Sequence, residues 1–161
     1  MATALKNLSE YDAATIPSGK GRRFVIVVSE WNAQVTNAMA EGAIKTLTDN
    51  GVDDKDITVK HVPGTFELTY AAARLNRTDL CDGIICIGCV IQGETRHFDF
   101  ICEGVANGLS MVNAEGQVPA IFGVLTTDNL QQALDRAGGR LGNKGVEAAV
   151  TALKMSELKR I

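Results

Sequence analysis

The sequence predicts an α/β fold, a three-layer α/β/α sandwich built around a four-stranded parallel sheet. Four runs typical of strands alternate with segments whose apolar residues recur at helical spacing, so the strands must be joined by crossover helices. The run at residues 83–91 (GIICIGCVI) is apolar almost throughout, as in a parallel strand that helices cover on both faces. Right-handed crossovers with helices on both sides of the sheet complete the prediction.

An N-terminal arm is expected to precede a single domain. Residues 1–22 are polar and include the turn-forming stretch at 17–21 (PSGKG), whereas the first strong apolar run begins at residue 23. We therefore divide the chain into an arm, residues 1–22, which could contribute a further strand, and one α/β domain, residues 23–161. A chain of 161 residues is long enough to bury one such core.

The first two strand–helix units follow the arm. A strand is expected at residues 23–29 (RFVIVVS), followed by a helix with Asn32 as its N-cap and Gly51 as its stop. A second strand of alternating type is expected at residues 57–63 (ITVKHVP), before another helix. The expected apolar faces are Val35, Met39, Ala43 and Leu47 in the first helix, and Leu68, Ala71, Ala72 and Leu75 in the second.

The third and fourth units contain the most apolar strands. A polar loop leads from the strand at 83–91 into a long helix. A fourth strand is expected at residues 119–127 (PAIFGVLTT), with Thr127 and Asp128 capping a short helix that Gly138 and Gly139 end. A last helix follows. The expected apolar faces of these three helices are Phe98, Ile101, Val105, Leu109 and Val112; Leu130, Ala133, Leu134 and Ala137; and Val146, Ala149, Val150, Leu153 and Leu158.

The composition argues against nucleic-acid and membrane partners. The net charge is −3, and the 16 lysines and arginines are scattered along the chain. No apolar run approaches the roughly 20 residues that span a bilayer. Because the first 22 residues lack the apolar core of a signal peptide, the cytoplasm is the expected compartment.

The four cysteines are expected to be free thiols, and no metal site is expected. Cys86 and Cys89 have the spacing of a ligand pair. Both lie in the strand at 83–91, where residues three apart point to opposite faces, and no second Cys or His pair completes a site. Buried free thiols in a reducing compartment are the better interpretation, and they include Cys81 and Cys102.

The functional site is expected where the strands end, because ligands of such folds bind outside the carboxyl ends of the strands. The loop at 92–97 ends at a helix N-terminus, where free N–H groups, the Thr95 hydroxyl and the Arg96 charge favour an anion. His97 beside this anion site indicates chemistry. Together the loops supply aromatic rings, a carboxylate and an amide, which suit a flat polar heterocycle next to a phosphate. Four loops share this edge: residues 30–32, 64–67, 92–97 and 126–128.

Each candidate residue also has a purely structural interpretation. Trp31 could be a half-buried packing residue, and Glu67 could simply favour a helix start through its charge. His97 could be an ordinary first-turn residue, and Arg136 a cation near a helix C-terminus. The glycine-rich segment at 138–145 is not a P-loop, since it lacks the Gly-Lys-Ser/Thr ending and follows no strand. A dinucleotide site also has little support, because no G-x-G-x-x-G follows the first strand.

The sequence resembles the lumazine synthase family from the first strand to the last helix. The resemblance implies a flavodoxin-like fold and a transferase of riboflavin biosynthesis. Such an enzyme condenses 5-amino-6-(D-ribitylamino)uracil with 3,4-dihydroxy-2-butanone 4-phosphate, giving 6,7-dimethyl-8-ribityllumazine, phosphate and water. It implies no metal or organic cofactor, and homopentamers that in some members form closed shells of twelve pentamers. The segments that carry it are VSEWNAQVTNAM (28–39), VPGTFEL (62–68), GCVIQGETRHFDFI (88–101), PAIFGVLTT (119–127) and DRAGGRLGNKGVEAAVTAL (135–153).

The resemblance also implies roles for individual residues. His97 would transfer protons. The butanone phosphate would be held by Gly93, Glu94 and Thr95 with Arg136, Glu94 acting through its backbone N–H only. The pyrimidine and its ribityl chain would be bound by Trp31, Asn32, Thr65, Phe66, Glu67, Cys89, Val90, Ile91, Phe122 and Lys144. Of these residues Phe122, Arg136 and Lys144 would come from the adjacent subunit of a pentamer.

Four positions depart from the commonest family pattern. Gln92 and Arg96 stand where arginine and threonine are frequent, and Glu94 stands where the phosphate turn often has a small residue. Trp31 stands where phenylalanine is frequent, and we expect its larger ring to stack on riboflavin. Two alternatives to the enzyme remain open, a non-enzymatic flavin-binding module and a shell-forming assembly protein of the same fold.

Overall fold

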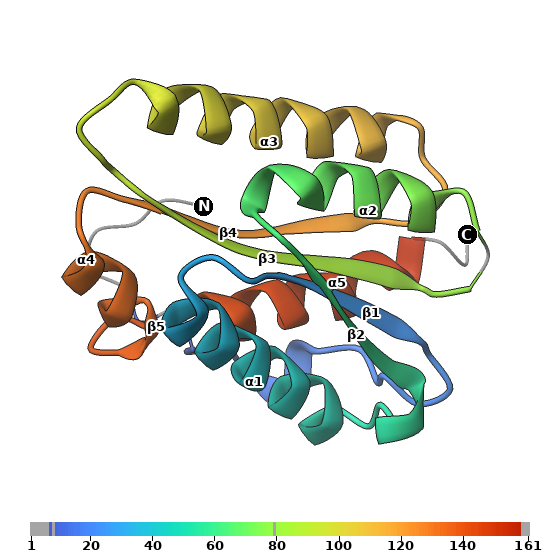
Figure 1. Ribbon diagram of the computed structural model, residues 1–161. Coiled ribbons are helices and arrows are strands. Elements are labelled where there is room, and N and C mark those ends of the chain that lie inside the picture. The colour runs from blue at the N-terminus through green and yellow to red at the C-terminus, as the bar shows by residue number, and fades with distance from the viewer. Residues whose placement is uncertain (1–6, 8, 79, 159–161) are drawn as a thin grey trace.

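A four-stranded parallel sheet forms the centre of the protein (Figure 1). The computed structural model describes residues 7, 9–78 and 80–158. The spatial order of the strands is β2-β1-β3-β4, so the third and fourth strands of the chain extend the sheet away from β2. The strand bounds are Phe24–Ser29 (β1), Ile57–Val62 (β2), Gly83–Ile91 (β3) and Ala120–Thr127 (β4).

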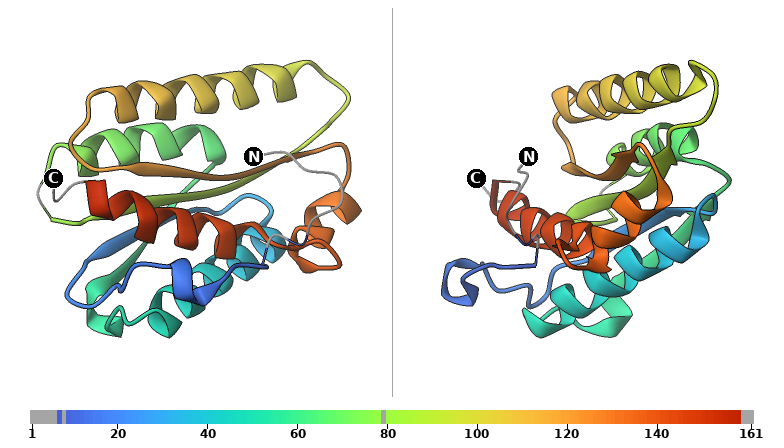
Figure 2. Two further views of the ribbon diagram at one scale, coloured as in Figure 1. Left: turned by 180° about the vertical axis from the view of Figure 1, so that it is seen from behind. Right: turned by 90° about the vertical axis from the view of Figure 1, so that its left-hand side faces the viewer.

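Helices cover both faces of the sheet, which confirms the predicted three-layer sandwich. In Figure 1, α2 and α3 lie above the sheet and α1 and α5 lie below it, and Figure 2 shows the same layers from behind and from the side. Each helix begins soon after the strand before it, as crossover connections require. The helix bounds are Ala33–Asp49 (α1), Leu68–Asn76 (α2), His97–Ala114 (α3), Leu130–Asp135 (α4) and Lys144–Leu158 (α5).

The alternation of side chains along β1 and β3 divides the core in two. Phe24 and Ile26 pack against α1 and α5, whereas Val25 and Val27 pack against α2 and α3. The same alternation puts Cys86 in the second cluster and Cys89 in the first, which confirms that the two thiols point to opposite faces. All four cysteines are free.

Helices α1 and α5 pack backbone against backbone. A Cβ atom on Gly145 would lie 1.8 Å from the carbonyl oxygen of Met39, so only glycine fits there. The buried Asn143 side chain fixes this contact: it donates to the carbonyl of Ala38 at 2.9 Å and accepts from the Gly145 N–H at 2.8 Å. A buried amide with several partners is costly to replace, so this junction holds the start of α5 in place.

The two expected helix caps differ from the prediction: Asn32 holds the N-cap position of α1 without a side-chain capping bond, and the cap expected for α4 is wrong. Asn32 stands before α1, but its side chain makes no capping bond and its backbone is left-handed, with φ of 60°. Its amide instead donates to the carbonyl of Cys89 at 2.9 Å, a tertiary contact that local capping rules do not include. Helix α4 is capped by Asn129, whose side chain accepts from the Gln132 N–H at 2.9 Å, and not by Thr127 and Asp128.

Helix α4 is shorter than expected. It ends at Asp135, and Ala137 belongs to a small antiparallel hairpin formed by β5 (Ala137–Gly139) and β6 (Gly142–Asn143). The positive φ of Gly138 and Gly142, 111° and 83°, permits this tight reversal. Glycine pairs therefore build the hairpin instead of simply stopping a helix.

Two expected burial patterns also differ. Strand β2 is present, but its residues do not alternate between buried and exposed, because it is an edge strand beyond the helices that cover β1 and β3. On α5 the expected residues Ala149 and Leu153 are buried, but the rest of the buried face is formed by small residues: Gly145, Ala148, Ala152 and Ser156. Val146 and Val150 are half-buried, and Leu158 is 58% exposed.

The described part of the N-terminal arm contains one short 3-10 helix, η1 (Ala13–Thr15), and no strand. The end of the arm is tied to the domain: Gly19 donates to the carbonyl of Asn50 at 2.8 Å. The buried Arg22 donates to the carbonyl of Leu153 at 3.0 Å and pairs with Glu157. Two further 3-10 turns are η2 (Asp54–Asp56) and η3 (Thr65–Glu67).

Within the described ranges, no helix has the length and apolar character needed to cross a membrane.

Candidate active site

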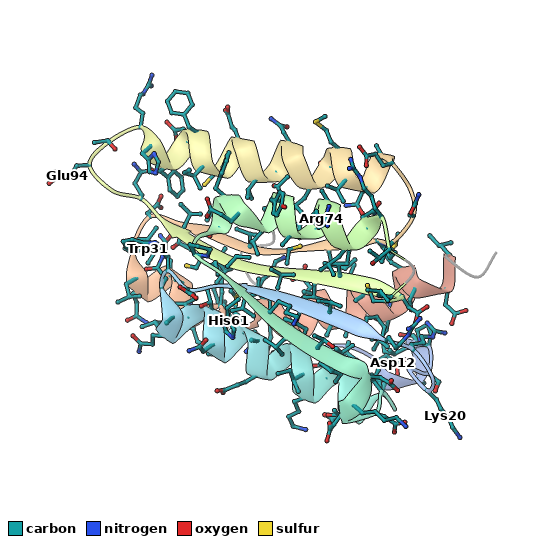
Figure 3. The ribbon with its side chains drawn as sticks, turned by 45° about the vertical axis from the view of Figure 1, so that its right-hand side comes forward. Asp12, Lys20, Trp31, His61, Arg74 and Glu94 are labelled. Carbon is teal, nitrogen blue, oxygen red and sulfur yellow. The ribbon has the colours of Figure 1, made fainter. Side chains whose placement is uncertain are left out.

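The carboxyl ends of all four strands meet at one edge of the sheet, on the left of Figure 1. Figure 3 shows Trp31 and Glu94 at this edge. The loop after β1 is joined to the loop after β2, since Trp31 donates its N–H to the carbonyl of Pro63 at 3.4 Å. The loop after β3 is joined to the end of β4, since Gln92 donates to the carbonyl of Thr127 at 2.8 Å.

A cavity of about 520 Å³ opens at this edge, and we call it the Trp31 cavity. It gathers residues from three strand ends and from the first turns of α3. The residues around it are Trp31, Asn32, Gly64, Thr65, Phe66, Glu67, Cys89, Val90, Ile91, His97 and Ile101. Ile101 was not among the candidate residues, although its position four residues after His97 puts both on one face of α3.

The floor of the Trp31 cavity is rigid. Thr65 is 5% exposed and rests in a notch over Gly88, where a Cβ atom would lie 2.7 Å from the Thr65 methyl carbon. Asn32 spans the floor through its bond to the Cys89 carbonyl, which leaves its amide oxygen available to a ligand. Both residues are therefore held in position before any ligand binds.

The rim of the cavity carries a carboxylate and two aromatic rings. The side chains of Glu67 and Trp31 meet over Gly64, where a Cβ atom would lie 2.9 Å from the Glu67 carboxylate and 3.7 Å from the indole. Phe66 packs on α3 at Gly104 yet remains 54% exposed. Trp31 is 74% exposed, which rejects the alternative that it is a packing residue within its own chain. An exposed indole beside a carboxylate suits a flat, polar ring.

The loop before α3 offers free backbone donors. Within the residues that the structure describes, the N–H groups of Gly93, Glu94 and Thr95 have no hydrogen-bond partner. The Thr95 hydroxyl accepts from the His97 N–H at 3.4 Å and so sits at the N-terminus of the helix. The Glu94 side chain projects outward from the tip of the loop (Figure 3). The loop can therefore bind an anion through its N–H groups without the Glu94 carboxylate facing it.

The Cys89 thiol is not a nucleophile at neutral pH. Burial raises its pKa to about 11, so it stays protonated. Cys89 shapes the cavity wall, and the other titratable side chains around the cavity are His97 and Glu67. In the described ranges, no group of three or more His, Cys, Asp or Glu side chains could hold a metal ion.

Six of the candidate residues do not line the Trp31 cavity: Gly93, Glu94 and Thr95 lie on the adjacent loop before α3, and Phe122, Arg136 and Lys144 lie elsewhere on the same chain. Phe122 and Lys144 line a separate cavity of about 650 Å³, between the end of α3, the start of β4 and α5. Phe122 is 40% exposed there, and Lys144 pairs with Glu147 at 2.8 Å. Arg136 follows α4 and, among the described residues, forms no ion pair. One chain thus carries two groups of candidate residues on different surfaces.

Comparison with known proteins gives a consistent result. Residues 21–160 match the family model of 6,7-dimethyl-8-ribityllumazine synthase. A protein of that name from Porphyromonas gingivalis is 56% identical over 161 residues, which cover 100% of both chains. A relative of the same name from Phocaeicola vulgatus is 52% identical over 99% of this chain and 95% of its own. Another, from Flavobacterium johnsoniae, is 52% identical over 99% of this chain and 84% of its own.

Proposed function

Since the chain belongs to the 6,7-dimethyl-8-ribityllumazine synthase family and has lumazine synthase activity, we propose that the Trp31 cavity is its pyrimidine site and His97 its proton-transfer residue. The observation that carries this proposal is the cavity itself. It brings the imidazole of His97 together with Trp31 and Glu67 from separate loops. The family assignment favours an enzyme over the two non-enzymatic alternatives.

The substrates follow from the activity and from the shape of the cavity. 5-Amino-6-(D-ribitylamino)uracil is flat and polar, and its ring stacks on the exposed indole of Trp31. Its ribityl hydroxyls reach Thr65, Phe66 and Glu67, and Asn32 offers an amide oxygen to a donor. Val90 and Ile91 close the edge of the ring site.

The phosphate of 3,4-dihydroxy-2-butanone 4-phosphate binds the loop before α3. The free N–H groups of Gly93, Glu94 and Thr95 and the N-terminus of α3 favour a dianion. Arg136 adds a guanidinium, the group best suited to planar, bidentate phosphate contacts. His97 begins the same helix, so the ketone beside the phosphate lies within its reach.

The reaction needs repeated proton transfers. The amine of the pyrimidine attacks the ketone, and the resulting carbinolamine loses water to give an imine. Phosphate then leaves, and ring closure releases a second water. An imidazole can accept and donate protons near neutral pH, so one residue serves successive steps. Because both substrates are reactive, holding them in contact supplies much of the rate acceleration.

Two neighbouring subunits complete each site. The Trp31 cavity lacks Phe122, Arg136 and Lys144, which lie on other surfaces of the same chain. We propose a homopentamer in which each subunit supplies these residues to its neighbour, either alone or within a shell of twelve pentamers. Light scattering on the active enzyme measures the size of the assembly. A fully active monomer would contradict the shared site.

His97→Ala tests the role of the imidazole. We expect kcat to fall by roughly ten- to a hundredfold, at or just below the usual contribution of general acid–base catalysis. The assay follows phosphate release and lumazine absorbance with both substrates present. His61→Ala is the matched control, because His61 is exposed on the edge strand β2 and does not line the cavity (Figure 3). An unchanged kcat in His97→Ala would remove this residue from the mechanism.

A further inference from the structure

A small polar cluster forms where α4 meets the hairpin, and we call it the Asp135 cluster: Gln131, Asp135, Arg136 and Arg140. The Asp135 carboxylate is mostly buried, with its side chain 11% exposed. One of its oxygens accepts from the Gln131 amide at 2.9 Å, and the other accepts from Nε of Arg140 at 2.7 Å. Both oxygens of this carboxylate are therefore engaged.

The hairpin is what brings Arg140 to this carboxylate. Leu141 donates its N–H to the carbonyl of Asp135 at 2.8 Å, which folds the hairpin back over the end of α4. The approach is close, because a Cβ atom on Gly139 would lie 2.7 Å from the carbonyl oxygen of Leu134. Arg140 thus reaches Asp135 across the turn, although the arginine next to Asp135 in the chain is Arg136.

Arg136 is the cation in this cluster without an ion pair among the described residues. The charge of Arg136 nevertheless acts on Asp135. The pKa of Asp135 is lowered, first by the hydrogen bond from Gln131, then by Arg140, and also by the charge of Arg136. The carboxylate is ionised at neutral pH and lies within electrostatic reach of both arginines. Arg136 is the other cation whose charge lowers this pKa, so without Arg140 the freed oxygen of Asp135 would attract Arg136.

We propose that Arg140 is a positioning residue, which pairs with Asp135 and so leaves the Arg136 guanidinium free to bind the phosphate of 3,4-dihydroxy-2-butanone 4-phosphate. This proposal rests on the proposed function, which assigns that phosphate to Arg136. With Arg140 present, the two arginines and Asp135 carry a net positive charge toward the ligand. Without it, Arg136 and Asp135 neutralise each other, and the phosphate loses both a donor and an attractive charge.

If the pair of Arg140 and Asp135 only stabilised the fold, removing Arg140 would lower the unfolding temperature. The proposal predicts a different result. Arg140 is 73% exposed on its side chain, and exposed ion pairs contribute little to stability. A variant without Arg140 should therefore unfold at nearly the same temperature as the wild type. What should change is the affinity for one substrate only, the one that carries the phosphate.

Arg140→Gln is the central variant, measured by steady-state kinetics with each substrate varied in turn. We expect KM for the butanone phosphate to rise about tenfold, the value of one charge-assisted hydrogen bond, while KM for the pyrimidine stays within about twofold. Arg140→Lys should restore most of the affinity. Arg77→Gln is the matched control, because Arg77 is also an exposed arginine near a carboxylate, 3.9 Å from Glu115, far from this cluster in the sequence.

The double variant Asp135→Asn with Arg140→Gln separates charge from structure. Removing the carboxylate frees Arg136 again, so KM for the butanone phosphate should return to within about twofold of the wild type. A double variant as weak as Arg140→Gln alone would overturn the proposal, because it would show that the hairpin and not the charge matters. Arg140→Lys and the double variant still provide the test if Arg140→Gln does not assemble.

Arg136→Gln distinguishes the role of Arg140 from the assignment on which it rests, that Arg136 binds the phosphate. If Arg136→Gln leaves KM for the butanone phosphate unchanged, Arg136 does not bind the phosphate, and both proposals fail. If Arg136→Gln raises this KM and Arg140→Gln does not, the phosphate assignment stands and the role of Arg140 is overturned. A rise in both single variants with recovery in the double variant supports the proposal.

Discussion

Gly88→Ala tests the rigid floor of the Trp31 cavity. The added Cβ atom would lie 2.7 Å from the methyl carbon of Thr65, 2.8 Å from its hydroxyl and 3.0 Å from a methyl of Leu68. Thr65 is 5% exposed and Leu68 is fully buried, so neither can move without disturbing its surroundings. Overpacking of this kind costs about 1–3 kcal/mol.

The expected loss of stability can be measured as a shift in Tm. In a chain of this size 1 kcal/mol corresponds to about 2–4 °C, so Gly88→Ala should lower Tm by on the order of 5 °C. Displacement of Thr65 should also raise KM for the pyrimidine. Gly93→Ala is the control for stability, because a Cβ atom there meets nothing within 4 Å. Both variants restrict the unfolded chain equally, so their difference isolates the clash. Equal Tm values, with an unchanged KM in Gly88→Ala, would refute the described packing of Thr65 on Gly88.

The remaining predictions concern the indole and the thiols. Riboflavin should bind the Trp31 cavity and quench the fluorescence of Trp31, which is the single tryptophan, and a titration without quenching would count against the stacking role. Burial raises the pKa of Cys86 from 9.0 to about 12, so its stabilising contribution is complete below pH 9 and is lost as the pH rises toward 12. In urea unfolding between pH 8 and pH 10.5, the midpoint should therefore fall less steeply for Cys86→Ala than for the wild type, and parallel slopes would contradict this.

The sequence predicted the elements whose pattern is repeated over many residues. Strand β3 is apolar from end to end and was expected with the bounds that it has. The helices α1 and α3 likewise follow long apolar periods. The hairpin of β5 and β6 was not expected, because strands of three and two residues rich in glycine carry no hydrophobic period. The capping bond expected from Asn32 is absent because the amide of Asn32 donates to the carbonyl of Cys89, a tertiary contact that local sequence cannot show.

The location of the site followed from topology more than from any single motif. Parallel strands bring their carboxyl ends to one edge, so loops far apart in the sequence meet there. Trp31, Thr65 and His97 lie around one cavity for this reason. Their individual roles remain proposals, as do those of Phe122 and Lys144, which a separate cavity holds. No pattern in the sequence could show that Arg140, and not Arg136, pairs with Asp135, because that choice depends on the fold of the hairpin.

Gly145 shows how evolution can be constrained at a residue that performs no chemistry. It has no side chain to offer a ligand, yet any replacement would drive its Cβ atom into the carbonyl of Met39 at 1.8 Å. Helix α5 would then have to shift, and Lys144, which stands immediately before Gly145, would shift with it. We therefore expect substitutions at Gly145 to be eliminated by selection as strictly as those at a catalytic residue. In a library of random variants, most clones with a substitution at Gly145 should be inactive because of packing alone.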